Sequence, residues 1–157
     1  MSEDRQHQDR WEVQQLICRY CELVDLGDWD SMSEVFTVDH VGVYNGMEVA
    51  GLDLLIANAR KNMVTDKMSA TLHNVLNFRI TLDGDSARCV SNYYALHRGA
   101  AEFEGQIYRM WGVYDDKLVR TESGWRIAHR DYTTVMTEGD ERMTFNGEDP
   151  TWNELSE

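Results

Sequence analysis

The apolar residues of this chain change their spacing once, near residue 65, and that change constrains the fold more than any other feature. Before it, apolar side chains recur at helical spacing in segments 11–26 and 51–63. After it, alternation with a period of two predicts four long strands, 72–82, 87–97, 106–119 and 125–136. Helices followed by consecutive strands are typical of an α+β domain. We therefore expect a strongly bent, mixed or antiparallel sheet wrapped over the N-terminal helices, giving a cone-shaped α+β barrel with a central cavity.

Local signals divide the chain further. Gly27 ends the first helix, and Asp28 is a good N-cap for a short second helix that would carry Trp29, Met32 and Phe36 on one face. Asn45-Gly46 predicts a hairpin after a strand at 40–44. We expect one domain over residues 1–136, followed by an acidic tail or flap over 137–157.

Asp25 occupies an unfavourable position for a carboxylate. It lies in the last turn of the first helix, where the helix dipole is negative. A partner that is cationic or shares a proton would explain an acid there, and His73 is the best partner in the sequence. The hypothesis is an Asp25–His73 pair.

Composition narrows the functional class. The formal net charge of −13 argues against nucleic acid and anionic membrane surfaces as partners. The N-terminal segment MSEDRQHQDR lacks the apolar region of a signal peptide, and no apolar run is long enough to cross a bilayer. Cys18 and Cys21 are interpreted as small buried residues rather than a redox centre, since a CxxC centre normally opens a helix. These features predict a cytoplasmic protein.

Four segments together resemble the SnoaL-like branch of the nuclear-transport-factor-two-like superfamily. They are RYCELVDLGDWDSMSEVFTVD, the glycine Gly51 that opens the third helix, TLHNVLNFRITLDGDSA and GWRIAHR. The superfamily includes scytalone dehydratase, bile acid 7α-dehydratase and hexachlorocyclohexane dehydrochlorinase, but some members only bind ligands. The resemblance implies no metal, no organic cofactor, and a homotrimer or homodimer.

The resemblance also implies roles for individual residues. His73 would be the base and Asp25 its partner, and Tyr20 and Tyr44 would polarise the oxygen atoms of the substrate. The dehydrochlorinase has a lysine in place of Tyr20 and an arginine near the position of His129, so this chain is closer to enzymes that expel oxygen leaving groups. The predicted reaction is dehydration or a retro-aldol-like cleavage of a small hydrophobic cyclic or aromatic hydroxylated substrate. An isomerase or cyclase of polyketide-like or steroid-like ligands is one alternative, and a non-catalytic binding or assembly domain is another.

Further residues are candidates for lining the substrate pocket. They are Phe36, Asn77, Tyr93, His97, Tyr108, Trp111 and His129. A metal site formed by Asp25, His73 and His97 is conceivable but less favoured. Arg130 and Asp131 are predicted to form a surface ion pair.

One feature of the His73 strand conflicts with this site. The stronger apolar face, with Leu76 and Phe78, lies opposite His73 if the strand alternates regularly. A β-bulge near Asn74, or a second face buried by a subunit contact, would resolve the conflict.

Overall fold

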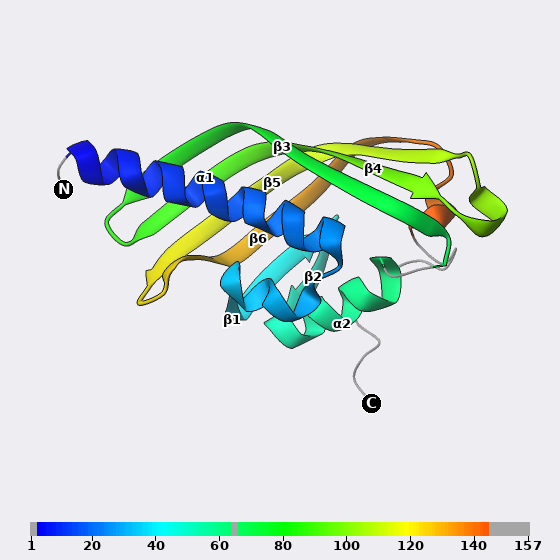
Figure 1. The fold of residues 1–157 in the computed structure, drawn as a ribbon. Coiled ribbons are helices and arrows are strands. Elements are labelled where there is room, and N and C mark those ends of the chain that lie inside the picture. The colour runs from blue at the N-terminus through cyan, green and yellow to red at the C-terminus, as the bar shows by residue number, and fades with distance from the viewer. Residues whose placement is uncertain (1–2, 64–65, 145–157) are drawn as a thin grey trace.

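The computed structural model describes residues 3–63 and 66–144 and shows a curved six-stranded sheet with helices on its inner side (Figure 1). The elements in chain order are α1 (Glu3–Leu26), η1 (Trp29–Glu34), β1 (Phe36–Tyr44), β2 (Met47–Ala50), α2 (Leu52–Met63), β3 (Met68–Asp83), β4 (Ser86–Gly99), η2 (Ala101–Phe103), β5 (Ile107–Thr121), β6 (Gly124–Glu138) and η3 (Glu141–Met143). The predicted helices and long strands are therefore confirmed, as is the α+β class. Among the described residues, no helix is both long and apolar enough to cross a membrane.

The strand order β2-β1-β6-β5-β4-β3 leaves the sheet open, with β2 and β3 at its edges. Strands β3 to β6 form an antiparallel meander, and β1 joins β6 in parallel. Figure 1 shows α1 lying across the face of the long strands, while α2 lies beside the short β1–β2 hairpin. The sheet is thus mixed and curved but not closed.

The core lies between α1 and the inner face of the sheet. Alternate residues of β4 and β5 point into it, because successive side chains of a strand face opposite sides. The buried apolar residues of these two strands and of α1 are Val13, Ile17, Cys21, Leu23, Val24, Ala87, Cys89, Tyr93, Ala95, Tyr108, Met110, Tyr114 and Leu118. We call this side of the sheet the inner face and the opposite side the outer face.

The predicted turns have the expected geometry. Asn45 and Gly46 have φ of 51° and 91°, the conformation that a tight two-residue hairpin requires. The Asp28 side chain accepts a hydrogen bond from the Ser31 N–H and so caps η1. Phe36, however, is not on that helix, because η1 ends at Glu34 and Phe36 begins β1.

The chain beyond residue 136 is partly built into the body of the domain. Strand β6 continues to Glu138, and η3 follows with Met143 fully buried and Thr144 nearly so. Residues 145–157, which include most of the predicted tail or flap, lie outside the described residues. The domain boundary at residue 136 stays a prediction.

Candidate active site

Asp25 is placed by the way α1 ends. Gly27 has a φ of 66°, and the N–H groups of Gly27 and Asp28 donate to the carbonyls of Val24 and Leu23 over 3.1 and 2.9 Å. These bonds close the helix in the manner of a Schellman cap. The last turn of α1 therefore ends against the N-terminal half of β3, and Asp25 reaches that strand.

His73 faces Asp25 because β3 contains a bulge. The register between β3 and β4 shifts between Leu76 and Arg79, and Asn77 within this shift has a φ of 58°. The extra residue moves the strand to the other phase, so that His73 lies on the inner face while Leu72 and Leu76 are 53% and 43% exposed. The regular alternation predicted for this strand is wrong. A bulge does restore the phase, at Asn77 rather than near Asn74.

The carboxylate of Asp25 and the imidazole of His73 are in direct contact. His73 Nδ1 lies 2.7 Å from Asp25 Oδ1. The backbone N–H of His73 donates to Oδ2 over 2.9 Å and to Oδ1 over 3.1 Å, and the Thr71 hydroxyl donates to Oδ1 over 3.0 Å. The side chains of His73 and Asp25 are 7% and 19% exposed, so the pair is sheltered but not sealed from solvent.

These hydrogen bonds act on the pKa of Asp25 and on the tautomer of the neutral His73 ring. Burial alone would raise the pKa of Asp25, but the donors from His73 and Thr71 outweigh it, and the pKa of the carboxyl is lowered below its usual value. An ionised carboxylate can only accept hydrogen bonds, so His73 Nδ1 must donate to it. In the neutral imidazole, Nε2 is then left unprotonated and can accept a proton. The pair therefore holds the imidazole in one orientation, with Nε2 as its free acceptor.

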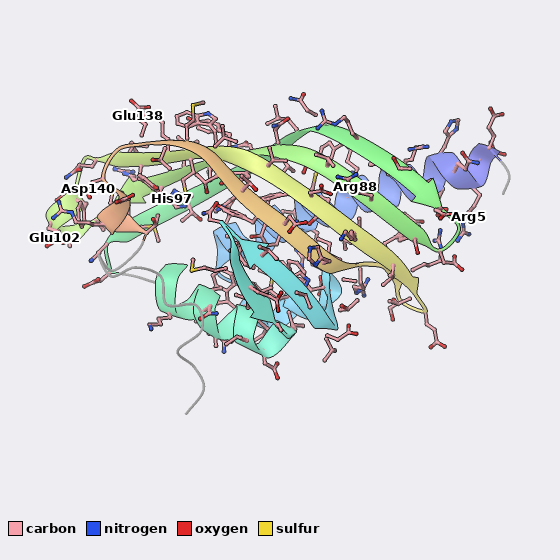
Figure 2. All side chains as sticks on the ribbon, turned by 180° about the vertical axis from the view of Figure 1, so that it is seen from behind. Arg5, Arg88, His97, Glu102, Glu138 and Asp140 are labelled. Atoms are coloured by element: carbon pink, nitrogen blue, oxygen red, sulfur yellow. The ribbon has the colours of Figure 1, made fainter. Side chains whose placement is uncertain are left out.

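Two further predicted residues lie near the pair, His97 beside His73 and Tyr108 beside His97. His97 is opposite Thr71 in the neighbouring strand, and its ring is edge-on to that of His73, with 5.6 Å between centroids. The Tyr108 ring lies 5.8 Å beyond His97. Figure 2 places His97 near the end of the sheet where η3 lies, far from Arg88 on the same strand. Asp25, His73, His97 and Tyr108 thus form one cluster.

Two buried histidines lead us to expect a loss of stability in mild acid. His40 and His97 are 0% and 1% exposed, and burial lowers the pKa of His40 to about 3 and that of His97 to about 4. Both values lie below the ordinary pKa of about 6.5, so the unfolded chain binds protons that the folded protein does not. Stability that is fully present above pH 6.5 is therefore lost as the pH falls, by up to about 1.4 kcal/mol per pH unit for each histidine.

Urea unfolding at about pH 7.5 and about pH 5 measures this loss. His40→Gln should reduce the difference between the two conditions, whereas His7→Gln, at an exposed position of α1, should leave it unchanged. Equal stability of the wild-type protein at both values would contradict the expectation.

Tyr20 and Phe36 lie in a second buried cluster, around a cation. The Arg130 guanidinium is 4.1 Å from the centroid of the Tyr20 ring, 4.2 Å from that of Tyr114 and 5.5 Å from that of Phe36. Asp116, directly opposite Arg130 in the sheet, holds it through contacts of 2.6 and 2.9 Å. Burial raises the pKa of Tyr20 to about 12, so its hydroxyl stays protonated. Tyr20 is therefore one of the aromatic rings that pack around the buried Arg130–Asp116 ion pair.

Tyr44 and Tyr93 extend this second cluster. Their rings lie 5.6 and 5.0 Å from the Tyr132 ring, and the Tyr93 hydroxyl is 3.0 Å from Thr134 Oγ1. Burial raises the pKa of both tyrosines. The rings of Tyr44, Tyr93 and Tyr132 pack on the inner face of the sheet between β1 and β4. None of them takes part in the hydrogen bonds that hold the Asp25–His73 pair.

The prediction that Arg130 and Asp131 form a surface ion pair is wrong. A register shift between β5 and β6 leaves one extra residue between Ile127 and His129, which turns Arg130 inward. Arg130 and Asp116 are both 0% exposed. Asp131 instead contacts His129, with 3.2 Å between Oδ2 and Nε2 and both side chains partly exposed. The sequence did not indicate that Arg130 is buried, since only the bulge in β6 turns its side chain inward.

Three predicted pocket residues lie away from the Asp25–His73 pair. Trp111 stacks on Tyr94 on the outer face, with 5.1 Å between centroids. Asn77 is exposed at the bulge, where its amide donates to Asn92 over 3.3 Å. His129 faces outward with Asp131. The expectation that these three line the pocket is corrected.

The described residues can also be compared with the requirements of a metal site and of a cysteine redox centre. No three His, Cys, Asp or Glu side chains in residues 3–63 and 66–144 are grouped so that they could hold a metal ion. Cys18, Cys21 and Cys89 are free thiols whose pKa values are raised, chiefly by burial. A raised pKa disfavours the thiolate that a redox centre requires.

Comparison with known proteins relates this arrangement to a family. The model of the SnoaL-like domain matches residues 5–131. An uncharacterised protein of Mycobacterium tuberculosis is 32% identical over 129 residues, which cover 78% of this chain and 82% of that protein. A crystal structure of a Kribbella flavida protein has 28% identity and a TM-score of 0.77, over 84% of this chain and 94% of the other. A hexachlorocyclohexane dehydrochlorinase from Novosphingobium barchaimii, at 15% identity, shares the fold with a TM-score of 0.74 over 89% and 95% of the two chains.

Proposed function

Because the chain belongs to the SnoaL-like family, we propose that it is a cofactor-independent lyase in which His73 removes a proton from a small substrate. The observation that carries the proposal is the 2.7 Å contact between His73 Nδ1 and Asp25 Oδ1. It gives the imidazole one tautomer and leaves Nε2 as the base. The dehydrochlorinase that shares the fold is named for an elimination, which is the class of reaction we propose here.

The proposed elimination proceeds by proton transfer from carbon. Nε2 of His73 takes the proton, and the electron pair of the C–H bond forms a double bond. The C–O bond breaks with its electron pair on the leaving oxygen, which takes up a proton from the imidazolium or from solvent and departs as water. Asp25 stabilises the imidazolium that forms, and general acid–base help of this kind is worth about 10²–10⁴-fold. The substrate class is a small hydrophobic cyclic or aromatic compound with hydroxyl or carbonyl groups, since aromatic rings dominate the inner face.

A tyrosine hydroxyl is proposed to polarise the oxygen of the substrate. Tyr108 suits this role better than Tyr20 and Tyr44, because its ring contacts His97, which contacts His73. Burial raises the pKa of Tyr108, so the hydroxyl remains a donor. Tyr20 and Tyr44 are then assigned to the cluster around Arg130. His97 is proposed as a substrate contact, with Tyr93 and Phe36 forming the deeper wall.

Replacement of the pair tests the proposal. We expect Asp25→Asn and His73→Ala to lower turnover by about 10²–10⁴-fold. The assay screens hydroxylated cyclic and aromatic compounds for the ultraviolet absorbance of a new conjugated double bond. The matched controls are Asp131→Asn and His129→Ala, which remove the same kind of contact on the outer face. Turnover near the wild-type level in both site variants would refute the lyase.

The same screen separates the alternatives. Loss of water lowers the mass of the product, whereas isomerisation or cyclisation by the same base leaves the mass unchanged. A compound that binds and is recovered unaltered would support a binding domain instead.

We also propose a homodimer or homotrimer formed through the outer face. That face carries apolar side chains that solvent would otherwise contact, namely Leu72, Leu76, Val135, Met136 and the stacked pair Tyr94 and Trp111. Exposed apolar patches of this kind mark contact surfaces. Light scattering should give a mass two or three times 18.2 kDa, and a monomer would contradict the proposal.

A further inference from the structure

Thr71 contacts the Asp25–His73 pair through its hydroxyl. Thr71 and His73 are two positions apart in β3 and so share the inner face. The Thr71 hydroxyl donates to Asp25 Oδ1 over 3.0 Å, the same oxygen that accepts from His73 Nδ1 over 2.7 Å. Neither the sequence motifs nor the family comparison assigned a role to this residue.

The backbone alone does not orient the carboxylate. The His73 N–H contacts both carboxylate oxygens at similar distances, 2.9 and 3.1 Å, and therefore hardly distinguishes between them. The terminal torsion of an aspartate is broad, so a further donor is needed to hold one oxygen in line with the ring. Among the described residues, the Thr71 hydroxyl is the side-chain donor, besides the His73 ring, that is directed at Oδ1.

We propose that Thr71 is a positioning residue, whose hydroxyl holds Asp25 Oδ1 toward His73 Nδ1 and thereby keeps the imidazole in the Nδ1–H tautomer. The inference rests on the proposed function of the pair, in which Nε2 must be the free base. Thr71 acts through Asp25 and not on the substrate. A hydroxyl suits this task because it is uncharged and leaves the single negative charge of the pair on Asp25.

Nitrogen chemical shifts of the imidazole test this role without a substrate. The ¹⁵N shifts of Nδ1 and Nε2 report which nitrogen carries the proton, and they are compared in the wild type, Thr71→Val and Thr71→Ser. We expect the ratio of the Nε2–H to the Nδ1–H tautomer of His73 to rise in Thr71→Val, by at most about fivefold, since the change cannot exceed the free energy of the one hydrogen bond that is lost. Thr71→Ser keeps the hydroxyl and should match the wild type.

Two more variants make the test specific. Thr81→Val makes the same chemical change in β3 at an exposed position and should not affect His73. Thr71→Ala removes the hydroxyl without adding an apolar group, and should reproduce Thr71→Val even if the valine were poorly accommodated. Unchanged tautomer ratios in both the valine and alanine variants would overturn the proposal, and so would failure of the serine variant to match the wild type.

The readout separates this inference from the proposed function. Tautomer ratios depend on the pair and not on turnover. If Thr71→Val shifts the tautomer while Asp25→Asn and His73→Ala retain full turnover, Thr71 positions the pair but the pair is not catalytic. If those two variants lose turnover and Thr71→Val shifts nothing, the lyase stands and the role of Thr71 fails.

Discussion

Replacing Asp116 with alanine is expected to lower the free energy of unfolding by about 3–5 kcal/mol. Asp116 and Arg130 are both fully buried and joined by two hydrogen bonds, so Asp116→Ala leaves a guanidinium without its counterion in the core. Arginine cannot lose its proton under these conditions. The three aromatic rings around Arg130 offset only part of that cost.

Asp115→Ala is the matched control. Asp115 precedes Asp116 on the same strand and also binds an arginine through two contacts, of 2.8 and 2.5 Å to Arg88. The Arg88 side chain, however, is 61% exposed, and exposed pairs contribute at most about 1 kcal/mol. Urea unfolding of both variants measures the difference. Equal losses for Asp115→Ala and Asp116→Ala would show that burial does not govern the energetics of the pair.

Replacing the other partner of the pair, in Arg130→Met, should give a variant whose free energy of unfolding depends differently on pH. Burial raises the pKa of Asp116, and Arg130 opposes that rise, so removing the arginine in Arg130→Met leaves a carboxyl that takes up a proton more readily in the folded than in the unfolded chain. The folded variant then binds more protons, and its stability rises as the pH falls. The loss of unfolding free energy in Arg130→Met, relative to the wild type, should therefore be smaller in mild acid than at neutral pH.

Replacing Asn77 with isoleucine is expected to disrupt the Asp25–His73 pair without touching either residue. Asn77 has a φ of 58°, which asparagine tolerates and a β-branched residue does not. Isoleucine would cost about 1–2 kcal/mol in that conformation. A regular strand avoids the cost, but it turns Leu72 and Leu76 inward and His73 outward. Turnover should fall toward that of His73→Ala, and the His73 ring should lose its contact with Asp25.

Deleting Asn77 should have the opposite outcome. Two residues of β3, Asn77 and Phe78, lie opposite one residue of β4 at the bulge. Removing the extra residue leaves a regular strand in which Phe78 and His73 both still face inward. The ¹⁵N shifts of His73 should stay close to those of the wild type in the deletion and change in Asn77→Ile. If both variants keep the Asp25–His73 contact, the bulge does not determine the orientation of His73.

Much of the fold could be predicted from local patterns. Helical spacing up to residue 63 and a period of two after it predicted α1, α2 and the four long strands, and Gly27, Asp28 and Asn45-Gly46 predicted the cap and turns. The contact between Asp25 and His73 was also expected, because a carboxylate at a helix C-terminus needs a partner, His73 was the best partner in the sequence, and the family resemblance implied the same pair. The catalytic role of that pair remains a proposal.

The sequence by itself therefore determined the element types, their order and the identity of the pair. Only the tertiary structure decided which residues share a face. Single extra residues in β3 and β6 bring His73 and Arg130 to the inner face, and His129 and Trp111 lie on the outer one. The physical reason is that alternation is a local property of a strand. A bulge, by contrast, is defined by the pairing of two strands, and the neighbouring strand is far away in the sequence.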